Sequence, residues 1–175
     1  MDHSTALAEL LARYAFHRHP LSRNNVGHLQ LVGQLQNRPL DILVEPGAPS
    51  TVVDLGYCTS QRIPTRDSGR LGGGAGGVTL PIHVLDHAVL TLDGLPLRSD
   101  GIYAVDLSHV NEGLAMKGAG RVQAVLGADV LTYHRAVIDY ATMSLNNRCS
   151  CRSVFGFESA ANRLHDSNRW ARHDD

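Results

Sequence analysis

Hydrophobic and polar positions alternate along much of this chain, which is the pattern of half-buried β-strands. Residues 29–35 alternate in this way, and so do residues 40–44. The short polar segment 36–39 between them ends in Pro39, which a turn accepts more readily than a strand interior. The two runs therefore predict a β-hairpin.

The same alternation recurs further along the chain. It predicts strands over residues 78–84, 88–92 and 102–107, and Asp93-Gly94 is a hairpin turn signal. An apolar run over residues 122–126 then stops at Gly127, and a short helix is expected after it. Asp129 falls in the first turn of that helix, where a carboxylate favours the helix N-terminus. Two last strands are expected near residues 137–140 and 143–145. The pattern predicts a mainly β domain.

In the N-terminal segment the apolar residues recur with the period of a helix and not with that of a strand. Apolar side chains share one face of a helix predicted over residues 4–16, and Pro20 ends that pattern. We expect this helix to pack on the outside of the domain or to lie across a dimer partner. The expected organisation is an N-terminal helical extension (1–24), a β domain (25–148) and a polar C-terminal tail (149–175).

The composition and net charge of the chain argue against several classes of function. The net charge of −1 over 175 residues gives no electrostatic reason to expect nucleic acid or an anionic membrane as a partner. The longest apolar runs are far shorter than the roughly 20 residues of a membrane-spanning helix. The N-terminus has no basic region followed by an apolar core, so we expect no signal peptide. Three cysteines are few and odd in number, which predicts a reduced, cytoplasmic protein.

Metal and cofactor signals are weak. His17 and His19 have no third ligand at suitable spacing, and Cys149 and Cys151 lack the CxxC-type spacing of zinc sites. We therefore expect no metal and no cofactor.

Six glycines fall within residues 69–77. A phosphate loop would need Gly-Lys-Ser/Thr opening a helix, but residues 78–81 open a strand instead. A dinucleotide-binding loop also needs a following helix. A glycine-rich hairpin fits better, with a plain flexible loop as the alternative.

The chemistry-bearing stretch is residues 45–51. The strand 40–44 ends at Glu45-Pro46-Gly47-Ala48, and apolar residues resume at Val52. A carboxylate is thus placed at the tip of a strand, on a tight loop. The stretch resembles the active-site loop of retropepsin-like aspartic peptidases, which reads Asp-Thr/Ser-Gly-Ala. Gly47 and Ala48 match that pattern, whereas Glu45 replaces the aspartate and Pro46 replaces the Thr or Ser.

A second block resembles the other half of the same domain. There an apolar-apolar-Gly segment passes under the active-site loop, a short helix follows, and an Ile-Asp-Tyr-like strand comes next. Here these features correspond to Leu126-Gly127, to a short helix near 128–134 and to residues 137–140. The resemblance spans roughly residues 26–147. It implies a retropepsin-like closed β-barrel, the acid protease fold, in which Asp129 and Asp139 are structural carboxylates.

The resemblance also implies site residues. Glu45, at the family's aspartate position, would be catalytic together with the loop residues Gly47 and Ala48. A flap would close over the substrate like a lid, with substrate-binding residues Gly73, Gly74, Ala75 and Gly76. In such enzymes one carboxylate acts as base on a water while its protonated partner polarises the peptide carbonyl. This chain has one such loop, so a homodimer would supply Glu45 twice and act on a peptide or protein substrate.

The two replaced residues leave three hypotheses open. Glutamate is one methylene longer than aspartate, and a misplacement of about 1 Å can cost about a hundredfold in rate. Pro46 offers neither a hydroxyl nor a backbone N–H. The protein is then a degenerate homologue that binds peptides without efficient cleavage, a slow peptidase that uses paired Glu45 carboxylates at acidic pH, or a structural module whose dimer surface is its function.

Overall fold

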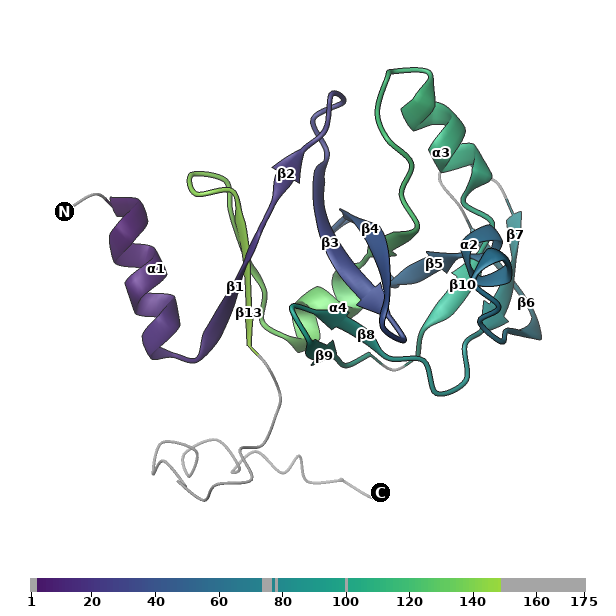
Figure 1. Ribbon diagram of the computed structural model, residues 1–175, viewed down its shortest axis with the longest axis horizontal. Helices are drawn as coiled ribbons and strands as arrows, with labels where there is room; N and C mark the ends of the chain where they lie inside the picture. Colours follow the sequence, from purple (N-terminus) through teal and green to yellow (C-terminus); the bar gives the residue numbers. More distant parts are fainter. Residues whose placement is uncertain (1–2, 74–76, 78, 100, 149–175) are drawn as a thin grey trace, which may run out of the picture.

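The computed structural model describes residues 3–73, 77, 79–99 and 101–148. Within them the chain is mainly β, with two sheets and four helices (Figure 1). The mainly β class expected from the alternating pattern is confirmed. β3 carries the pattern most clearly, because the residues Leu29, Leu31, Gly33 and Leu35 are buried and those between them are more exposed.

The small sheet joins the two ends of the described chain. β1 (Phe16–Pro20), β13 (Ser144–Arg148) and β12 (Val137–Asp139) pair antiparallel in the order β1-β13-β12. α1 (His3–Arg13) precedes β1 and lies at the edge of the molecule (Figure 1). The helix is shorter than the predicted 4–16, because residues from Phe16 onward pair with β13 instead. The proposed domain boundary at residues 24–25 stays a prediction.

The large sheet has the order β6-β7-β10-β5-β11-β4-β3-β8-β9, with β2 paired to β3. Among the described residues this path runs from β6 to β9 without a recorded pairing between those two ends. Its strands have the following bounds: β2 Ser22–Arg23, β3 Leu29–Leu35, β4 Arg38–Val44, β5 Val52–Asp54, β6 Arg66–Gly73, β7 Thr79–Val84, β8 Leu90–Leu92, β9 Leu95–Leu97, β10 Tyr103–Val105 and β11 Ala124–Leu126.

β11 is the strand that positions the acidic loop. It lies between β4 and β5, parallel to the first and antiparallel to the second. Leu126 pairs with Val44 at the end of β4, and Val125 pairs with Val52 at the start of β5. The segment Leu126-Gly127 therefore passes beneath the loop that joins β4 to β5, as expected from the sequence. α4 (Ala128–Tyr133) begins directly after it.

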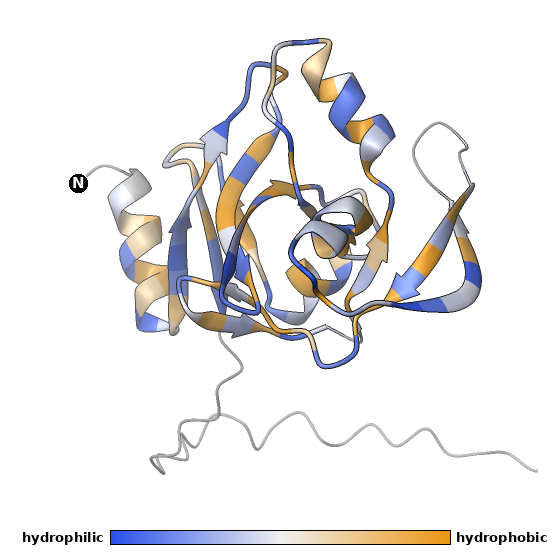
Figure 2. Cartoon of the chain, turned by 45° about the vertical axis from the view of Figure 1, so that its right-hand side comes forward, coloured by the Kyte–Doolittle hydropathy of each residue, from blue (hydrophilic) through white to orange (hydrophobic). Residues whose placement is uncertain are grey.

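The core has two parts, one on each face of β4. Ile42 and Val44 belong to the larger cluster, whose most enclosed members include Leu35, Leu90 and Leu126. Leu43 faces a smaller cluster with Val105, Leu107, Leu114, Val122 and Val125. Figure 2 shows apolar colour along the strands that contribute to these clusters. The end of β4 is thus buried on both faces, which makes it a rigid support for the residue that follows.

Two short helices were not predicted. α2 (Leu55–Ser60) follows β5 directly, and the Asp54 carboxylate caps it by accepting from the Gly56 N–H at 3.4 Å. α3 (Ser108–Ala115) is tied to the chain ahead of β11 by Asn111. The Asn111 amide donates to the Val122 carbonyl at 3.0 Å and accepts from the Val122 N–H at 2.8 Å. Helices this short depend on such tertiary contacts. No helix among the described residues is long and apolar enough to cross a membrane.

Candidate active site

The tip of the acidic loop carries Glu45. The Glu45 N–H donates to the Leu126 carbonyl at 3.0 Å, and the Ala48 N–H donates to the Glu45 carbonyl at 3.0 Å, which closes a tight turn. The Glu45 side chain folds back over that turn, where its Oε1 accepts from the Gly47 N–H at 3.0 Å. Glu45 is half-buried, whereas Pro46 and Gly47 are exposed. The loop therefore presents a carboxylate that is partly fixed and partly open to solvent.

The base of the loop is held by Thr51 and Asp129. The Thr51 N–H donates to Asp129 Oδ2 at 3.0 Å, and the Thr51 hydroxyl donates to Asp129 Oδ1 at 2.7 Å. The same hydroxyl accepts from the Gly127 N–H at 3.0 Å, and the Ala128 N–H donates to the Ala48 carbonyl at 2.8 Å. Thr51 is fully buried. Asp129 thus links α4 to the loop, in line with the structural role expected for it.

Gly127 allows the two segments to approach this closely. A Cβ at this position would lie 2.6 Å from the carbonyl carbon and oxygen of Ser50 and 2.9 Å from the Ala48 oxygen. Those atoms are backbone and cannot move without shifting the loop. The glycine is therefore required by the close approach and not by its φ of −95°.

The smaller apolar cluster extends from the sheet to the loop. Partly buried side chains that pack against it come from the loop (Ala48), from β7 (Leu80 and Ile82) and from α3 (Val110). The β6–β7 hairpin and α3 project from the same side of the body (Figure 1). The acidic loop is therefore flanked by two elements whose apolar side chains share its cluster.

The predicted glycine-rich hairpin is present. β6 and β7 pair antiparallel up to Gly73 and Thr79, with an irregularity between Asp67 and Arg70. The Ser68 hydroxyl donates to the Ile82 carbonyl at 2.6 Å across the hairpin. Gly73 is exposed at the end of β6. The other predicted flap residues, Gly74, Ala75 and Gly76, lie outside the described residues, and substrate binding by any of the four stays a prediction.

Two other titratable groups, Asp139 and Cys58, have a pKa that is shifted by their immediate surroundings. Asp139 accepts from the Thr142 hydroxyl at 2.6 Å and from the Ala141 N–H at 2.9 Å, and chiefly the first of these bonds lowers the pKa of its carboxyl. Burial, with the neighbouring Asp54 carboxylate, raises the pKa of the Cys58 thiol to about 11. A thiol of that pKa is a poor nucleophile at neutral pH. Neither group offers chemistry that competes with Glu45.

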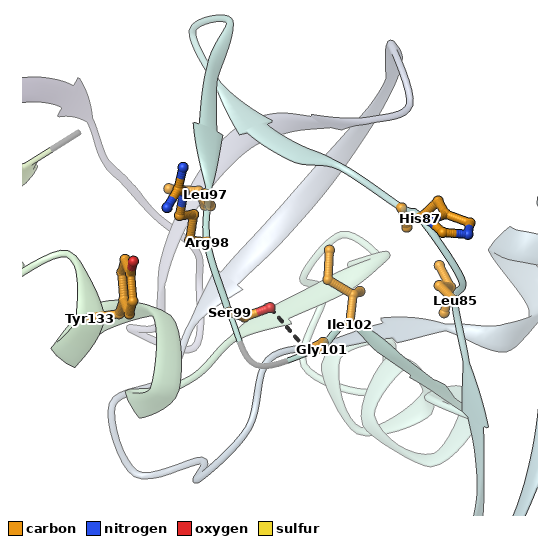
Figure 3. A pocket seen from close by; sticks show the side chains of 9 residues that line it. Leu85, His87, Leu97, Arg98, Ser99, Gly101, Ile102 and Tyr133 are labelled. Atoms are coloured by element: carbon orange, nitrogen blue, oxygen red, sulfur yellow. Dashed lines mark hydrogen bonds between the residues drawn. The ribbon is translucent and has the colours of Figure 1, made fainter. Parts of the chain in front are cut away.

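Two cavities lie away from the 45–51 loop. One of about 440 Å³ lies between the segment that joins β7 to β8, the end of β9 with the residues after it, and Tyr133 of α4. Tyr133 and His87 lie on opposite sides of it, and the Ser99 hydroxyl in its lining donates to the Gly101 carbonyl (Figure 3). A second of about 340 Å³ lies beside α2 and is lined by Asp54 and Arg121, among others. The lining of neither cavity includes a residue of the 45–51 loop. Sequence patterns gave no signal for either cavity, because each is formed by segments far apart in the chain.

Metal-ligating side chains do not gather in the described part of the chain. No group of three or more His, Cys, Asp or Glu residues there is arranged to hold a metal ion. Cys149 and Cys151 lie outside the described residues.

Comparison with solved structures finds retropepsin-like proteases. A retropepsin-like aspartic protease from Rickettsia conorii matches with a TM-score of 0.47 and 16% identity, over 75% of this chain and 91% of that chain. The retroviral protease-like domain of Ddi1 from Leishmania major matches with a TM-score of 0.45 and 13% identity, over 69% and 92%. The EIAV protease in complex with the inhibitor HBY-793 matches with a TM-score of 0.43 and 16% identity, over 59% and 85%. No family model and no curated protein matches the sequence.

Proposed function

We propose that this chain is an aspartic-peptidase-family protein whose Glu45 carboxylates, one from each of two copies, form the hydrolytic pair, and whose catalysis is weak or lost. The observation that carries this proposal is the placement of Glu45. Glu45 directly follows a strand that is buried on both faces. The loop on which it lies is held at its base by the hydrogen bond between Thr51 and Asp129. The Glu45 carboxylate also accepts from the Gly47 N–H, which orients it.

A pair of such carboxylates has the chemistry for peptide hydrolysis. Two carboxylates a few ångströms apart cannot both ionise readily, so they share one proton. The ionised member takes a proton from a water, and the protonated member donates a hydrogen bond to the carbonyl under attack. The loop 45–51 contains one acidic residue, so the second carboxylate must come from a second copy of the chain.

Two features of the tip explain why the activity would be weak. Glutamate has an additional rotatable bond, and its extra methylene displaces the carboxylate by about 1 Å, enough for about a hundredfold loss in rate. Pro46 is exposed and supplies neither a hydroxyl nor an N–H with which the tips of two loops could bond to each other. The fold that places the acid is therefore kept while the groups that would brace it are changed.

A second candidate function is a peptide-binding or dimerisation module on the same fold. The side chains of Leu10 on α1 and of Tyr14 just after it favour it, because they are 49% and 63% exposed although both lie on the apolar face predicted from the sequence. An apolar helix face of this kind suits association better than catalysis.

The test compares the purified full chain with its Glu45→Gln variant on a mixed peptide library from pH 3.5 to 7, read by mass spectrometry. Asp41→Asn is the matched control, since Asp41 is exposed on β4 four residues before Glu45. Cleavage that disappears with Glu45→Gln and persists with Asp41→Asn supports the peptidase. Cleavage that survives Glu45→Gln contradicts it. Peptide binding without cleavage by a folded dimer supports the binding module.

A further inference from the structure

One buried histidine lies outside the candidate active site and has an unusual set of neighbours. The side chain of His19, on β1, is only 4% exposed. Its Nδ1 lies 2.5 Å from Asp93 Oδ2, and its Nε2 lies 2.8 Å from Asn147 Oδ1. Both ring nitrogens therefore face oxygen atoms.

These contacts connect the two sheets. His19 and Asn147 belong to the small sheet, on β1 and β13, and Asp93 belongs to the β8–β9 turn at the edge of the large sheet. The register places His19 opposite Leu145, which is part of the main core. The Asp93-Gly94 turn has positive φ at both residues, as in the tight two-residue turns that join the strands of a hairpin.

The oxygen partners decide which form of the ring is satisfied. A neutral imidazole has one N–H donor and one bare nitrogen acceptor, whereas an imidazolium has two donors. A bare Nε2 facing Asn147 Oδ1 would set two lone pairs against each other. With both nitrogens protonated, the ring donates to a carboxylate on one side and to an amide oxygen on the other.

His134 provides an internal contrast. It is also buried, but its Nε2 accepts from the Arg98 N–H at 2.8 Å while its Nδ1 donates to the Arg148 carbonyl at 2.7 Å. That arrangement suits the neutral ring. The same chain thus encloses one histidine in a neutral site and another between two acceptors.

The charged group in contact with the His19 ring favours the cation. Asp93 is the charged group that contacts the ring in the described part of the chain, and the Asp93 side chain is 66% exposed, so it remains hydrated on its outer side. Among the described side chains on the elements packed against β1, the titratable ones are Glu9 and Arg13 on α1, Tyr14 just after it, and Arg148 on β13. His17 and Arg18 on β1 itself are exposed, and Arg18 donates to the Thr142 carbonyl.

We propose that His19 is an acid-dependent latch that fastens the small sheet to the β8–β9 turn when its imidazole is protonated. The latch is closed while both ring nitrogens carry protons and Asp93 is ionised, and it opens when the ring loses one of these protons. The inference stands on these contacts and does not depend on peptidase activity. Its consequence is that the sheet joining the two ends of the described chain is firmest under acidic conditions.

The protonation state is tested directly by long-range ¹H–¹⁵N NMR of the histidine rings in the full chain. His19→Gln assigns the His19 signals among those of ten histidines. At pH 5.5 both His19 nitrogens are expected to carry protons, and at pH 8.5 one of them is expected to have lost its proton. A ring that stays singly protonated from pH 5 upward would overturn the latch, because the Asn147 amide nitrogen would then be the group facing Nε2.

The consequence for stability is tested by thermal unfolding. His19→Gln and Asp93→Asn are each expected to lower Tm by roughly 5 °C at pH 5.5 and by less than half of that at pH 8.5. His17→Gln is the matched control, an exposed histidine two positions earlier on the same strand, and its Tm should follow the parent at both pH values. Asp93→Asn changes an exposed turn residue and keeps the test valid if His19→Gln fails to fold. A loss that is equal at the two pH values, or larger at pH 8.5, contradicts the proposal.

Discussion

The base and the tip of the 45–51 loop are built differently. At the base, Thr51 donates two hydrogen bonds to Asp129 and accepts a third from the Gly127 N–H, and backbone atoms leave no space for a Cβ on Gly127. At the tip, the Glu45 carboxylate accepts one hydrogen bond within the described part of the chain, from the Gly47 N–H, and its neighbours Pro46 and Gly47 are exposed. The base therefore determines the conformation of the loop, and the tip determines its chemistry. Changes at the base should act on stability, and changes at the tip on chemistry.

The largest effect is expected at Gly127. A valine there would place its Cβ 2.6 Å from the Ser50 carbonyl, and neither backbone can move away cheaply. We expect Gly127→Val to lower the free energy of unfolding by at least about 3 kcal/mol. Urea unfolding followed by circular dichroism measures it. Gly120→Ala is the control, since a Cβ there meets no atom within 4 Å. A folded Gly127→Val protein of parental stability would mean that the loop and β11 are not in close contact.

The tip is tested next by restoring the residues of the resembled family. Glu45→Asp with Pro46→Thr shortens the acid and returns a hydroxyl and an N–H to the loop. If the scaffold at the base is intact, kcat/KM for peptide cleavage should rise by about a hundredfold, equivalent to about 2.7 kcal/mol in transition-state stabilisation. The single Glu45→Asp variant separates the effect of acid length from that of Pro46. No gain in a folded dimer would place the defect in the flap or the dimer contact.

Thr51 is the next position along the base. Thr51→Val keeps the shape of the side chain but removes the hydroxyl that donates to Asp129 and accepts from Gly127. Because Thr51 is fully buried and water cannot replace these bonds, the free energy of unfolding should fall by about 2 kcal/mol. Thr132→Val, at an exposed position of α4, should change it by less than about 0.5 kcal/mol. Equal losses in the two variants would show that the hydroxyl bonds contribute little.

The sequence predicted the parts of this site that local pattern controls. Alternation located β3 and β4, the apolar run 122–126 located β11, and the stop at Gly127 with Asp129 shortly after it located the start of α4. A carboxylate at the end of a strand, followed by Pro-Gly, was enough to predict an acidic loop. In each case the information lies within about ten consecutive residues, where side-chain period and turn chemistry act directly.

The missed parts depend on distant partners. α3 has few apolar residues of its own and is held by the Asn111 bonds to Val122. β1 reads Phe-His-Arg-His-Pro, which does not alternate, and it becomes a strand by pairing with β13 at the other end of the described chain. His19 and Asp93 are 74 positions apart, so no sequence window contains both. A pattern search could list these residues but not bring them together.

The smallest effect, and the most direct comparison of tip with base, comes from making the same chemical change at both. Glu45→Gln keeps an oxygen for the Gly47 N–H, and the half-exposed amide can bond to water, so stability should change by less than about 0.5 kcal/mol. Both carboxylate oxygens of Asp129 accept a hydrogen bond from Thr51, and Asp129→Asn replaces one of them with an NH2 group that cannot accept. The free energy of unfolding should therefore fall by about 1–2 kcal/mol. Urea unfolding of both variants at pH 7 measures the difference. If Glu45→Gln destabilised the protein as much as Asp129→Asn, the Glu45 carboxylate would be a structural group like Asp129, and its candidacy for catalysis would fall with that result.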